Sequence, residues 1–340
     1  MSEKTEKRTV AIHTIAPKDG NYEFLNKALD GGVLGLALRE RGIDLVVSHK
    51  SSFKDGVFYE PDPLEDGTFG LRPSDVTADE IGAVYSRVVA PLPYMDILGI
   101  PQLNPSNFKG LGASKASMRG LLGSLEIPTT ILGVDSVEMA DFSQSDKWVL
   151  KPVRGRLSKG FQRVPSDELK AKLSKFESHI IQPYVGIGRV PSDVHGVSKA
   201  DQEIIEAARS KGLPAEIRII AIQTGDDQTI TAPLMRVSNN GADHIDGDDV
   251  YVDIVMQDKT AELLTSETLS IFKRVSEKAG VEGQPLIVAA DYLFDGERMW
   301  AMEINLRSPT LPSTKKHPAA SSILYAAMAD TLDVMTRGTL

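Results

Sequence analysis

The sequence predicts an α/β protein in which a parallel unit comes first and an antiparallel unit comes last. Short apolar strands alternate with helical apolar spacing over residues 8–49, which is typical of a small parallel α/β unit. Residues 214–239 alternate in apolar character around Gly225-Asp226-Asp227, which predicts two antiparallel strands. Residues 285–305 predict a further hairpin near the end of the chain.

The N-terminal unit is expected to contain several buried strands and one helix. The expected elements are strands at 8–16, 43–49, 81–89 and 99–107 and a helix at 21–42 that ends at Gly42. Residues 51–75 are rich in Gly, Pro and Asp, and we therefore expect a loop there.

The middle and C-terminal parts of the chain continue this alternation. The expected middle elements are a helix within 105–132, a strand–loop–strand at 146–164, a helix at 166–176 and a strand at 179–188. Met118, Leu121, Leu122 and Leu125 carry the spacing of the first helix, which Pro128 ends. Further helices are expected at 199–211, 259–280 and 317–335.

Length and composition exclude several classes of protein. A chain of 340 residues with 41% hydrophobic and 25% charged residues is typical of a globular protein with two or three structural units. The net charge of −9 argues against binding to a nucleic-acid backbone. Cysteine is absent, which excludes disulfides, thiolate nucleophiles and Cys-ligated zinc. With no signal peptide and no membrane-length apolar run visible, we expect a cytoplasmic protein with no membrane partner.

Two lysines are candidates for binding phosphate. Lys115 lies in "GLGASKAS", which is not a P-loop because Ser114 stands where that motif needs glycine. By itself, Lys115 is better explained as a solvated lysine early on a helix. Lys151 ends the apolar stretch "WVL" and precedes the cationic, glycine-containing loop 153–160. Such a loop can cover a polyphosphate, although a basic surface hairpin has the same composition.

Arginines in predicted strands need a counter-charge. Glu216 and Arg218 are two residues apart and therefore share one face of a strand, and Arg236 lies in the next strand. A buried arginine without a partner is very unfavourable. Either a structural carboxylate or a bound anion could provide the partner, and the sequence leaves this open.

The hairpin 285–305 carries oxygen ligands of the kind that Mg²⁺ prefers. Asp291 lies in the apolar run "LIVAADYLF", and Glu303 and Asn305 lie in the returning strand. A buried acid that is hydrogen-bonded to backbone is the alternative. The three side chains share a face only if the turn has an odd number of residues or the hairpin contains a bulge. A plain two-residue turn would separate them and would exclude the metal site.

The order of these features resembles that of the ATP-grasp enzymes. The matching features, in order, are Lys115, Lys151 with loop 153–160, Gln182 and Tyr184, Glu216-x-Arg218, Arg236, and Asp291 followed by Glu303-x-Asn305. The final "EINLRSPT" is most similar to bacterial glutathione synthetase, and the ribosomal-protein glutamate ligases are close relatives. The resemblance covers residues 80–335.

This resemblance implies a fold and a set of binding roles. The implied domains are an N-terminal parallel α/β domain at 1–106, a small lid at 107–185 and an antiparallel catalytic domain at 186–340. ATP-binding roles are implied for Lys115, Lys151, Gly155, Ser158, Lys159, Gly160, Gln182, Pro183, Tyr184 and Glu216. The implied catalytic residues are Arg218 and Arg236, and the implied ligands of two Mg²⁺ ions, or of Mn²⁺, are Asp291, Glu303 and Asn305.

The implied activity is ATP-dependent amide formation between a carboxylate and an amine through an acyl phosphate. Substrate contacts are implied for Arg87, Asn240, Arg307, Ser308 and Thr310. We expect an amino acid or a small, for example γ-glutamyl, peptide as substrate, and a homodimer or homotetramer. A small-molecule kinase and an inactive nucleotide-binding module are the alternatives. The lid loop is poorer in glycine than in glutathione synthetases, and residues 186–214 form a long insert, so the resemblance does not define the substrate.

Overall fold

The structure is a computed structural model, and the parts of the chain that it describes include at least one segment from every predicted unit. The described residues are 8–14, 33–49, 51–63, 69–86, 93–112, 114–131, 145–154, 160–172, 178–225, 229–238, 250–306 and 316–338. All structural statements below concern these residues.

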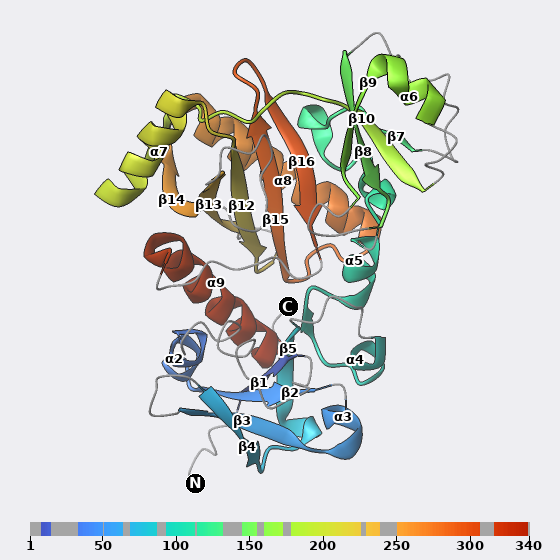
Figure 1. The fold of residues 1–340 in the computed structure, drawn as a ribbon. Helices are drawn as coiled ribbons and strands as arrows, with labels where there is room; N and C mark the ends of the chain where they lie inside the picture. Colours follow the sequence, from blue (N-terminus) through green and yellow to red (C-terminus); the bar gives the residue numbers. More distant parts are fainter. Residues whose placement is uncertain are drawn as a thin grey trace.

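A six-stranded sheet forms the N-terminal unit, in the strand order β4-β3-β2-β1-β5-β6 (Figure 1). Its strands are β1 (Arg8–His13), β2 (Ile43–Ser48), β3 (Phe58–Pro63), β4 (Phe69–Ser74), β5 (Ile81–Ser86) and β6 (Gln102–Leu103). Strand β1 pairs in parallel with β2 and β5, and β5 pairs in parallel with β6, as the sequence predicts. The helices are α2 (Val33–Arg39), α3 (Ser52–Asp55) and α4 (Pro93–Ile97), with the 3₁₀ turn η1 (Ala78–Glu80).

The loop expected at 51–75 is wrong, because most of this segment forms α3 and the antiparallel hairpin of β3 and β4. Pro61 and Pro73 lie within these strands. Proline is tolerated at the edge of a sheet, where a missing N–H breaks few ladder bonds. Strand β4 is such an edge, and β3 meets β2 only where Tyr59 pairs with Val47.

A four-stranded sheet, β7-β10-β8-β9, forms a smaller unit at the upper right of Figure 1. Its elements are β7 (Thr130–Ile131), β8 (Lys147–Pro152), β9 (Gln162–Pro165), α6 (Ser166–Lys172) and β10 (His179–Pro183). The predicted strand–loop–strand, helix and final strand of this region are therefore confirmed. Trp148, Leu150, Val164, Leu169 and Ile181 form its small core.

The helix predicted within 105–132 is largely wrong. The chain forms a short helix, α5 (Ser106–Leu111), and then two 3₁₀ turns, η2 (Ala116–Met118) and η3 (Gly123–Leu125). Gly120 and Gly123 have φ angles of 78° and 73°, which an α-helix cannot contain. The apolar spacing arises because the side chains of both turns face one core.

The C-terminal unit is a second six-stranded sheet, in the order β11-β14-β13-β12-β15-β16. Its strands are β11 (Val194–Gly196), β12 (Ala215–Gln223), β13 (Thr229–Val237), β14 (Val250–Met256), β15 (Leu286–Phe294) and β16 (Met299–Asn305). The helices are α7 (Lys199–Lys211), α8 (Asp258–Ala279) and α9 (Pro318–Arg337). All three helices and both predicted hairpins are confirmed, whereas β11 and β14 were not predicted.

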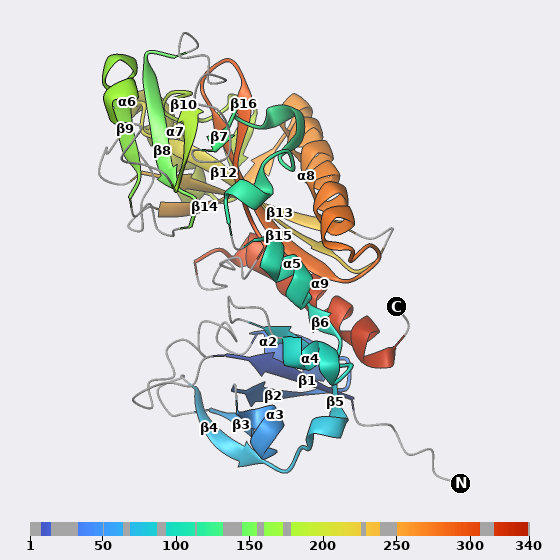
Figure 2. The same cartoon turned by 90° about the vertical axis from the view of Figure 1, so that its right-hand side faces the viewer.

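The two faces of the C-terminal sheet pack against different helices (Figure 2). Ile217 and Ile219 of β12 face α8, and the alternate residues Ile220 and Ile222 face α9. Helix α9 also packs on the N-terminal sheet, and it therefore lies between the two larger sheets. Among the described residues, no helix combines the length and the apolar character that crossing a membrane requires.

The predicted lid boundary at residue 107 does not follow the hydrophobic cores. Phe108, Met118, Leu122 and Leu125 belong to the same core as α8 and the C-terminal sheet. The four-stranded sheet has a core of its own, and its first strand begins at Thr130. The first part of the predicted lid, up to η3, therefore packs with the C-terminal unit.

Candidate active site

Polar side chains occupy one half of one face of the C-terminal sheet, and α9 covers the other half of that face. Strand pairing arranges them in two rows: Tyr251, Arg236 and Glu216 in the first, and Arg218, Asp291 and Glu303 in the second. Because alternate residues of a strand share a face, these rows point to the same side as Ile220 and Ile222. The sheet therefore presents a concentration of charged groups beside an apolar layer.

A β-bulge brings Asp291 and Glu303 opposite each other. Phe294 pairs with Met299 across the turn 295–298, a register that by itself would place Asp291 opposite Met302. The register shifts between Asp291 and Tyr292, so that Met302 is the extra residue and Asp291 pairs with Glu303. Asp291, Glu303 and Asn305 could share a face only with an odd-length turn or a bulge, and the structure contains the bulge.

Asp291 makes a bidentate ion pair with Arg218. Arg218 donates from Nε and Nη2 to the two carboxylate oxygens of Asp291, at 2.6 and 2.8 Å. Both side chains are about nine-tenths buried, so the pairing offsets a large desolvation cost. Burial lowers the pKa of Arg218, and Asp291 more than reverses this shift, so that the net change is upward. The sequence left open whether a structural carboxylate or a bound anion neutralises Arg218, and the structure shows the carboxylate of Asp291.

Glu216 and Arg236 form a second ion pair on the neighbouring strands. Burial raises the pKa of Glu216 to about 7, and Asp291 adds to the increase, whereas Arg236 and Arg218 oppose it. The Arg236 guanidinium also lies over the ring of Tyr251, with Cζ 5.3 Å from the ring centroid. Glu216 is therefore a carboxyl group that changes charge near neutral pH in response to its surroundings.

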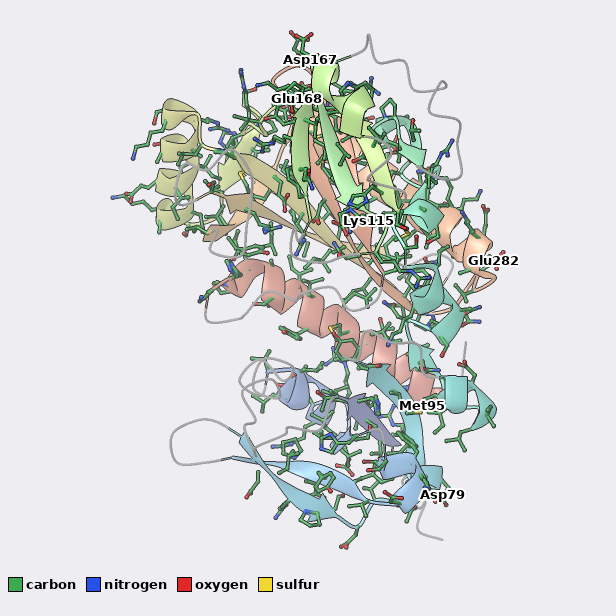
Figure 3. The ribbon with its side chains drawn as sticks, turned by 45° about the vertical axis from the view of Figure 1, so that its right-hand side comes forward. Asp79, Met95, Lys115, Asp167, Glu168 and Glu282 are labelled. Atoms are coloured by element: carbon green, nitrogen blue, oxygen red, sulfur yellow. The ribbon has the colours of Figure 1, made fainter. Side chains whose placement is uncertain are left out.

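Two lysines from other parts of the chain approach this polar face. Lys115 Nζ lies 3.7 Å from Glu303 Oε1, and its backbone N–H donates to the carbonyl of Val153 at 2.9 Å. Lys115 thus lies where the four-stranded sheet meets the C-terminal sheet (Figure 3). Burial lowers the pKa of Lys151, Glu303 and Glu216 oppose this shift, and Lys115 adds to it. Cationic groups therefore gather beside Glu303.

Gln182 is the second-last residue of β10 in the four-stranded sheet, and one of its amide atoms has no hydrogen-bond partner among the described residues. Its Nε2 donates to Thr129 Oγ1 at 2.7 Å, and its buried Oε1 accepts no hydrogen bond from the described residues. The neighbouring Tyr184 has the Arg163 guanidinium over its ring at 4.9 Å and donates its N–H to the carbonyl of Lys147. A buried acceptor beside an aromatic ring suits a planar, hydrogen-bonding ligand such as a nucleobase.

The oxygen groups near the bulge fit Mg²⁺ better than a closed protein-only metal site. Asp291, Glu303 and Asn305 lie on one face, and Asn305 Nδ2 donates to Asp291 Oδ2 at 3.1 Å. Glu303 has 48% of its side chain accessible, and it forms an ion pair with Lys115. Within the described part of the chain, no three or more His, Cys, Asp or Glu residues are grouped as a metal cluster. Mg²⁺ uses few protein ligands when phosphate oxygens complete its octahedron, which agrees with this donor set.

Comparisons with known proteins identify the fold. No protein-family model matches the chain. No curated protein matches it either. Solved structures match over nearly its whole length. D-alanine–D-alanine ligase from Bacillus anthracis, complexed with ATP, has 12% identity and a TM-score of 0.58 and covers 98% of each chain. D-cycloserine synthetase DcsG has 16% identity, a TM-score of 0.56, and coverage of 95% of this chain and 99% of its own.

The ATP-grasp ligase PsnB, complexed with a phosphomimetic variant of its minimal precursor, Mg and ADP, has 13% identity and a TM-score of 0.56. It covers 97% of this chain and 99% of its own. The chain has the ATP-grasp fold. The predicted fold class is thereby confirmed.

Within the ATP-grasp fold, the predicted site residues that the structure describes lie in the four-stranded unit, in the C-terminal sheet and in the segment of Lys115. Contacts or charge interactions link Lys115 and Lys151 to the polar face of the C-terminal sheet, whereas Gly160, Gln182, Pro183 and Tyr184 belong to the four-stranded unit. The described ones are Lys115, Lys151, Gly160, Gln182, Pro183, Tyr184, Glu216, Arg218, Arg236, Asp291, Glu303 and Asn305. Lys115 is not on a helix as predicted, because it directly precedes the 3₁₀ turn η2. The remaining predicted residues, Arg87, Gly155, Ser158, Lys159, Asn240, Arg307, Ser308 and Thr310, lie outside the described residues.

Asn104, which the sequence does not mark as functional, supports the candidate site of this ATP-grasp fold. Asn104 is buried with φ 65° and donates from Nδ2 to the carbonyls of Ile287 and Leu306, at 2.7 and 2.9 Å. Its Oδ1 accepts the N–H of Ile287 at 2.6 Å. Asn104 thus fixes the end of β16 directly after Asn305. Asn104 lies in the segment 99–107 that the sequence predicts as a strand, and nothing local indicates a partner so distant in the chain.

Proposed function

We propose that this chain is an ATP- and Mg²⁺-dependent ligase that joins a carboxylate to an amine. The observation that carries this proposal is the polar half of the sheet face, where oxygen ligands adjoin lysines from two other segments. Two anions, a carboxylate and ATP, can react only if cations arranged in advance screen their repulsion. The architecture shared with D-alanine–D-alanine ligase, D-cycloserine synthetase and PsnB supports the same reaction class.

In this proposal each group has one task. Asp291, Glu303 and Asn305 are proposed to bind two Mg²⁺ ions. Mn²⁺ is the alternative metal. Bound Mg²⁺ supplies charge neutralisation at the phosphate oxygens. Lys115 and Lys151 hold phosphates, because an incoming phosphate restores the charged form that burial disfavours in Lys151.

The nucleotide base is proposed to lie beside β10. Gln182, Pro183 and Tyr184 would receive the adenine, and the unpartnered Gln182 Oε1 provides an acceptor for it. Gly155, Ser158, Lys159 and Gly160 belong to the proposed lid over the phosphates. Excluding water there would protect the acyl phosphate from hydrolysis.

Arg218 and Arg236 are proposed to steady the transferring phosphoryl group. The substrate carboxylate oxygen attacks the γ-phosphorus, and ADP leaves. The amine nitrogen then attacks the acyl carbon, phosphate leaves with the bonding electron pair, and the nitrogen loses a proton. Each arginine already neutralises a carboxylate, so it presents oriented N–H groups without a large rearrangement.

We propose an amino acid or a small peptide, including a γ-glutamyl peptide as in glutathione synthesis, as substrate. Arg87, Asn240, Arg307, Ser308 and Thr310 are the proposed substrate contacts. The proposed domains are 1–106, 107–185 and 186–340, with the segment up to η3 packed on the core of the C-terminal sheet. We also propose a cytoplasmic homo-oligomer.

The proposal is tested by measuring ADP release with pairs of acids and amines drawn from amino acids and γ-glutamyl peptides. ADP release that requires both partners, with an amide product, is the expected result. ADP release with a hydroxyl acceptor alone would identify a kinase instead. No ADP release with any pair, while Mg²⁺ and ATP bind, would contradict the ligase proposal.

A further inference from the structure

A buried aspartate–histidine pair lies at the β14 end of the polar rows. Asp253 is 2% exposed and His317 7% exposed. His317 Nδ1 is 3.7 Å from Asp253 Oδ1, and neither atom has a hydrogen-bond partner among the described residues. A small movement of either side chain would therefore close a hydrogen bond between them. Neither residue has a role in the function proposed above.

Asp253 is held in place by the start of helix α9. Its Oδ2 accepts the N–H of Ala319 at 3.0 Å, which leaves Oδ1 directed to the histidine. His317 directly precedes α9 and is fixed by its position at the helix start. This arrangement, in which a carboxylate orients the Nδ1 side of an imidazole, leaves Nε2 to act on another group.

The pair is connected to the proposed phosphoryl-transfer site through Tyr251. The rings of His317 and Tyr251 meet edge to face with centroids 5.9 Å apart, and Arg236 lies over the same tyrosine. Asp253 pairs with Leu234, which in turn pairs with Arg218. Since neighbouring strands are about 4.8 Å apart, Asp253 lies two strands, or ~10 Å, from Arg218. The metal ligands lie beyond Arg218, on the opposite side from the pair.

The proposed amide-forming step needs an acceptor for the proton of the amine. An amine attacks only in its uncharged form, and the nitrogen carries an extra proton once the new C–N bond forms. Burial lowers the pKa of His317, Asp253 and Asp201 oppose the shift, and Lys316 adds to it. Burial raises the pKa of Asp253. The hydrogen bond from the backbone N–H of Ala319 and the electrostatic interaction with His317 oppose that change. The lowered pKa of His317 favours its uncharged form, which is able to accept a proton.

We propose that His317 is the general base that takes the proton from the attacking amine, and that Asp253 is the positioning residue that holds the imidazole for this step. The inference rests on the proposed ligase function. As the C–N bond forms and phosphate leaves with the C–O electron pair, the proton passes from the amine nitrogen to His317 Nε2. The amine nitrogen must accordingly reach His317 Nε2, on the side of Arg218 that is opposite the metal ligands.

The His317→Gln variant separates this role from a purely structural one. With the best acid from the screen above, we expect its amine-dependent ADP release to fall roughly 10²–10⁴-fold, which is the usual contribution of a general base. Hydroxylamine is largely uncharged at neutral pH and needs no base to attack the acyl phosphate. Hydroxylamine-dependent ADP release and hydroxamate formation should therefore stay near the wild-type rate. The matched control is His195→Gln, on the edge strand β11 of the same sheet, which should leave both rates unchanged.

Equal losses with amine and hydroxylamine in His317→Gln would overturn the inference, and so would unchanged amine turnover. Failure of wild-type protein to release ADP with any pair, hydroxylamine included, would instead contradict the ligase function.

The tautomer of His317, measured by ¹⁵N NMR of histidine-labelled protein, decides the geometry without turnover. We expect an uncharged ring with the proton on Nδ1 at neutral pH. The Asp253→Asn variant should shift this tautomer and lower amine turnover, and Asp253→Glu should restore part of both. A ring that is charged at neutral pH, or protonated on Nε2 alone, would contradict the assignment.

Discussion

The two halves of one face of the C-terminal sheet differ in what they contribute. On β12, Ile220 and Ile222 pack under α9, whereas Glu216 and Arg218, on the same face of the same strand, are charged. Burying the isoleucines stabilises the fold directly. Burying the charges costs free energy, which the ion pairs only offset. The apolar half therefore stabilises the contact between the C-terminal sheet and α9, whereas the polar half costs stability, as expected if it is the site of the proposed reaction.

The largest expected effect is on activity, at the polar half. Glu303→Ala removes a proposed Mg²⁺ ligand, and we expect ADP release to fall by at least ~10²–10³-fold, as for loss of a group that stabilises developing charge. Because the Glu303 side chain is 48% exposed, the melting temperature of the unliganded protein should hardly change. Unchanged ADP release in a folded variant would show that the metal assignment is wrong.

The next effect is on stability within the polar half. Arg218→Met leaves the Asp291 carboxylate buried without its cation, and we expect a loss of about 3–5 kcal/mol in the free energy of unfolding. Denaturant titration measures this loss. Adding Asp291→Leu should recover most of it, while activity stays absent. If the double variant were as unstable as the single one, the ion pair would not be the cause.

In the apolar half, Ile220→Ala should cost about 2–5 kcal/mol of unfolding free energy, because Ile220 is fully buried against the α9 layer. The specific activity of the folded molecules should stay near that of wild type. The control is Ile187→Ala, since Ile187 is 38% exposed and should lose far less stability. Similar losses in both variants would show that burial against the α9 layer is not the source of the stability that Ile220 contributes.

The smallest effect is the pH dependence that Glu216 contributes. Its pKa is raised to about 7 in the folded state from 4.5, so the folded protein binds this proton more tightly than the unfolded chain. Its contribution is fully present below pH 4.5 and is lost as the pH rises through about 7. Between pH 5 and 8, wild type should therefore lose on the order of 1 kcal/mol relative to Glu216→Gln. A difference between the two proteins that is constant over this range would exclude the shift.

Much of the fold follows from local pattern, and the site follows only in part. The hairpins of β12–β13 and β15–β16 and helices α7, α8 and α9 were predictable because their apolar periods and glycine stops are local. The 3₁₀ turns near Lys115 were not, since their side chains have the spacing of an α-helix. The hairpin of β3 and β4 was hidden by prolines that only a sheet edge tolerates.

The candidate site shows the same limit. The residue types at Lys151, Arg218 and Asp291 indicate chemistry, but the pairing of Arg218 with Asp291 joins residues 73 apart in sequence. The bulge at Met302 has no recognisable sequence signal. The sequence showed only that a shared face for Asp291, Glu303 and Asn305 would require a bulge or an odd-length turn. Alternation in "VYVDIV" could have indicated β14, and with it Tyr251 and Asp253, whereas His317 becomes significant only through its contact with them.

The central claim is that the polar half of the sheet face binds ATP through Mg²⁺. The most direct test is the melting temperature of wild type and Glu303→Gln with a non-hydrolysable ATP analogue, with and without Mg²⁺. A ligand that binds only the folded state at about 100 times its Kd stabilises it by roughly 2.7 kcal/mol. We predict a clear increase for wild type with Mg²⁺, little without it, and little in Glu303→Gln. Equal increases in both proteins, or an increase independent of Mg²⁺, would contradict the account.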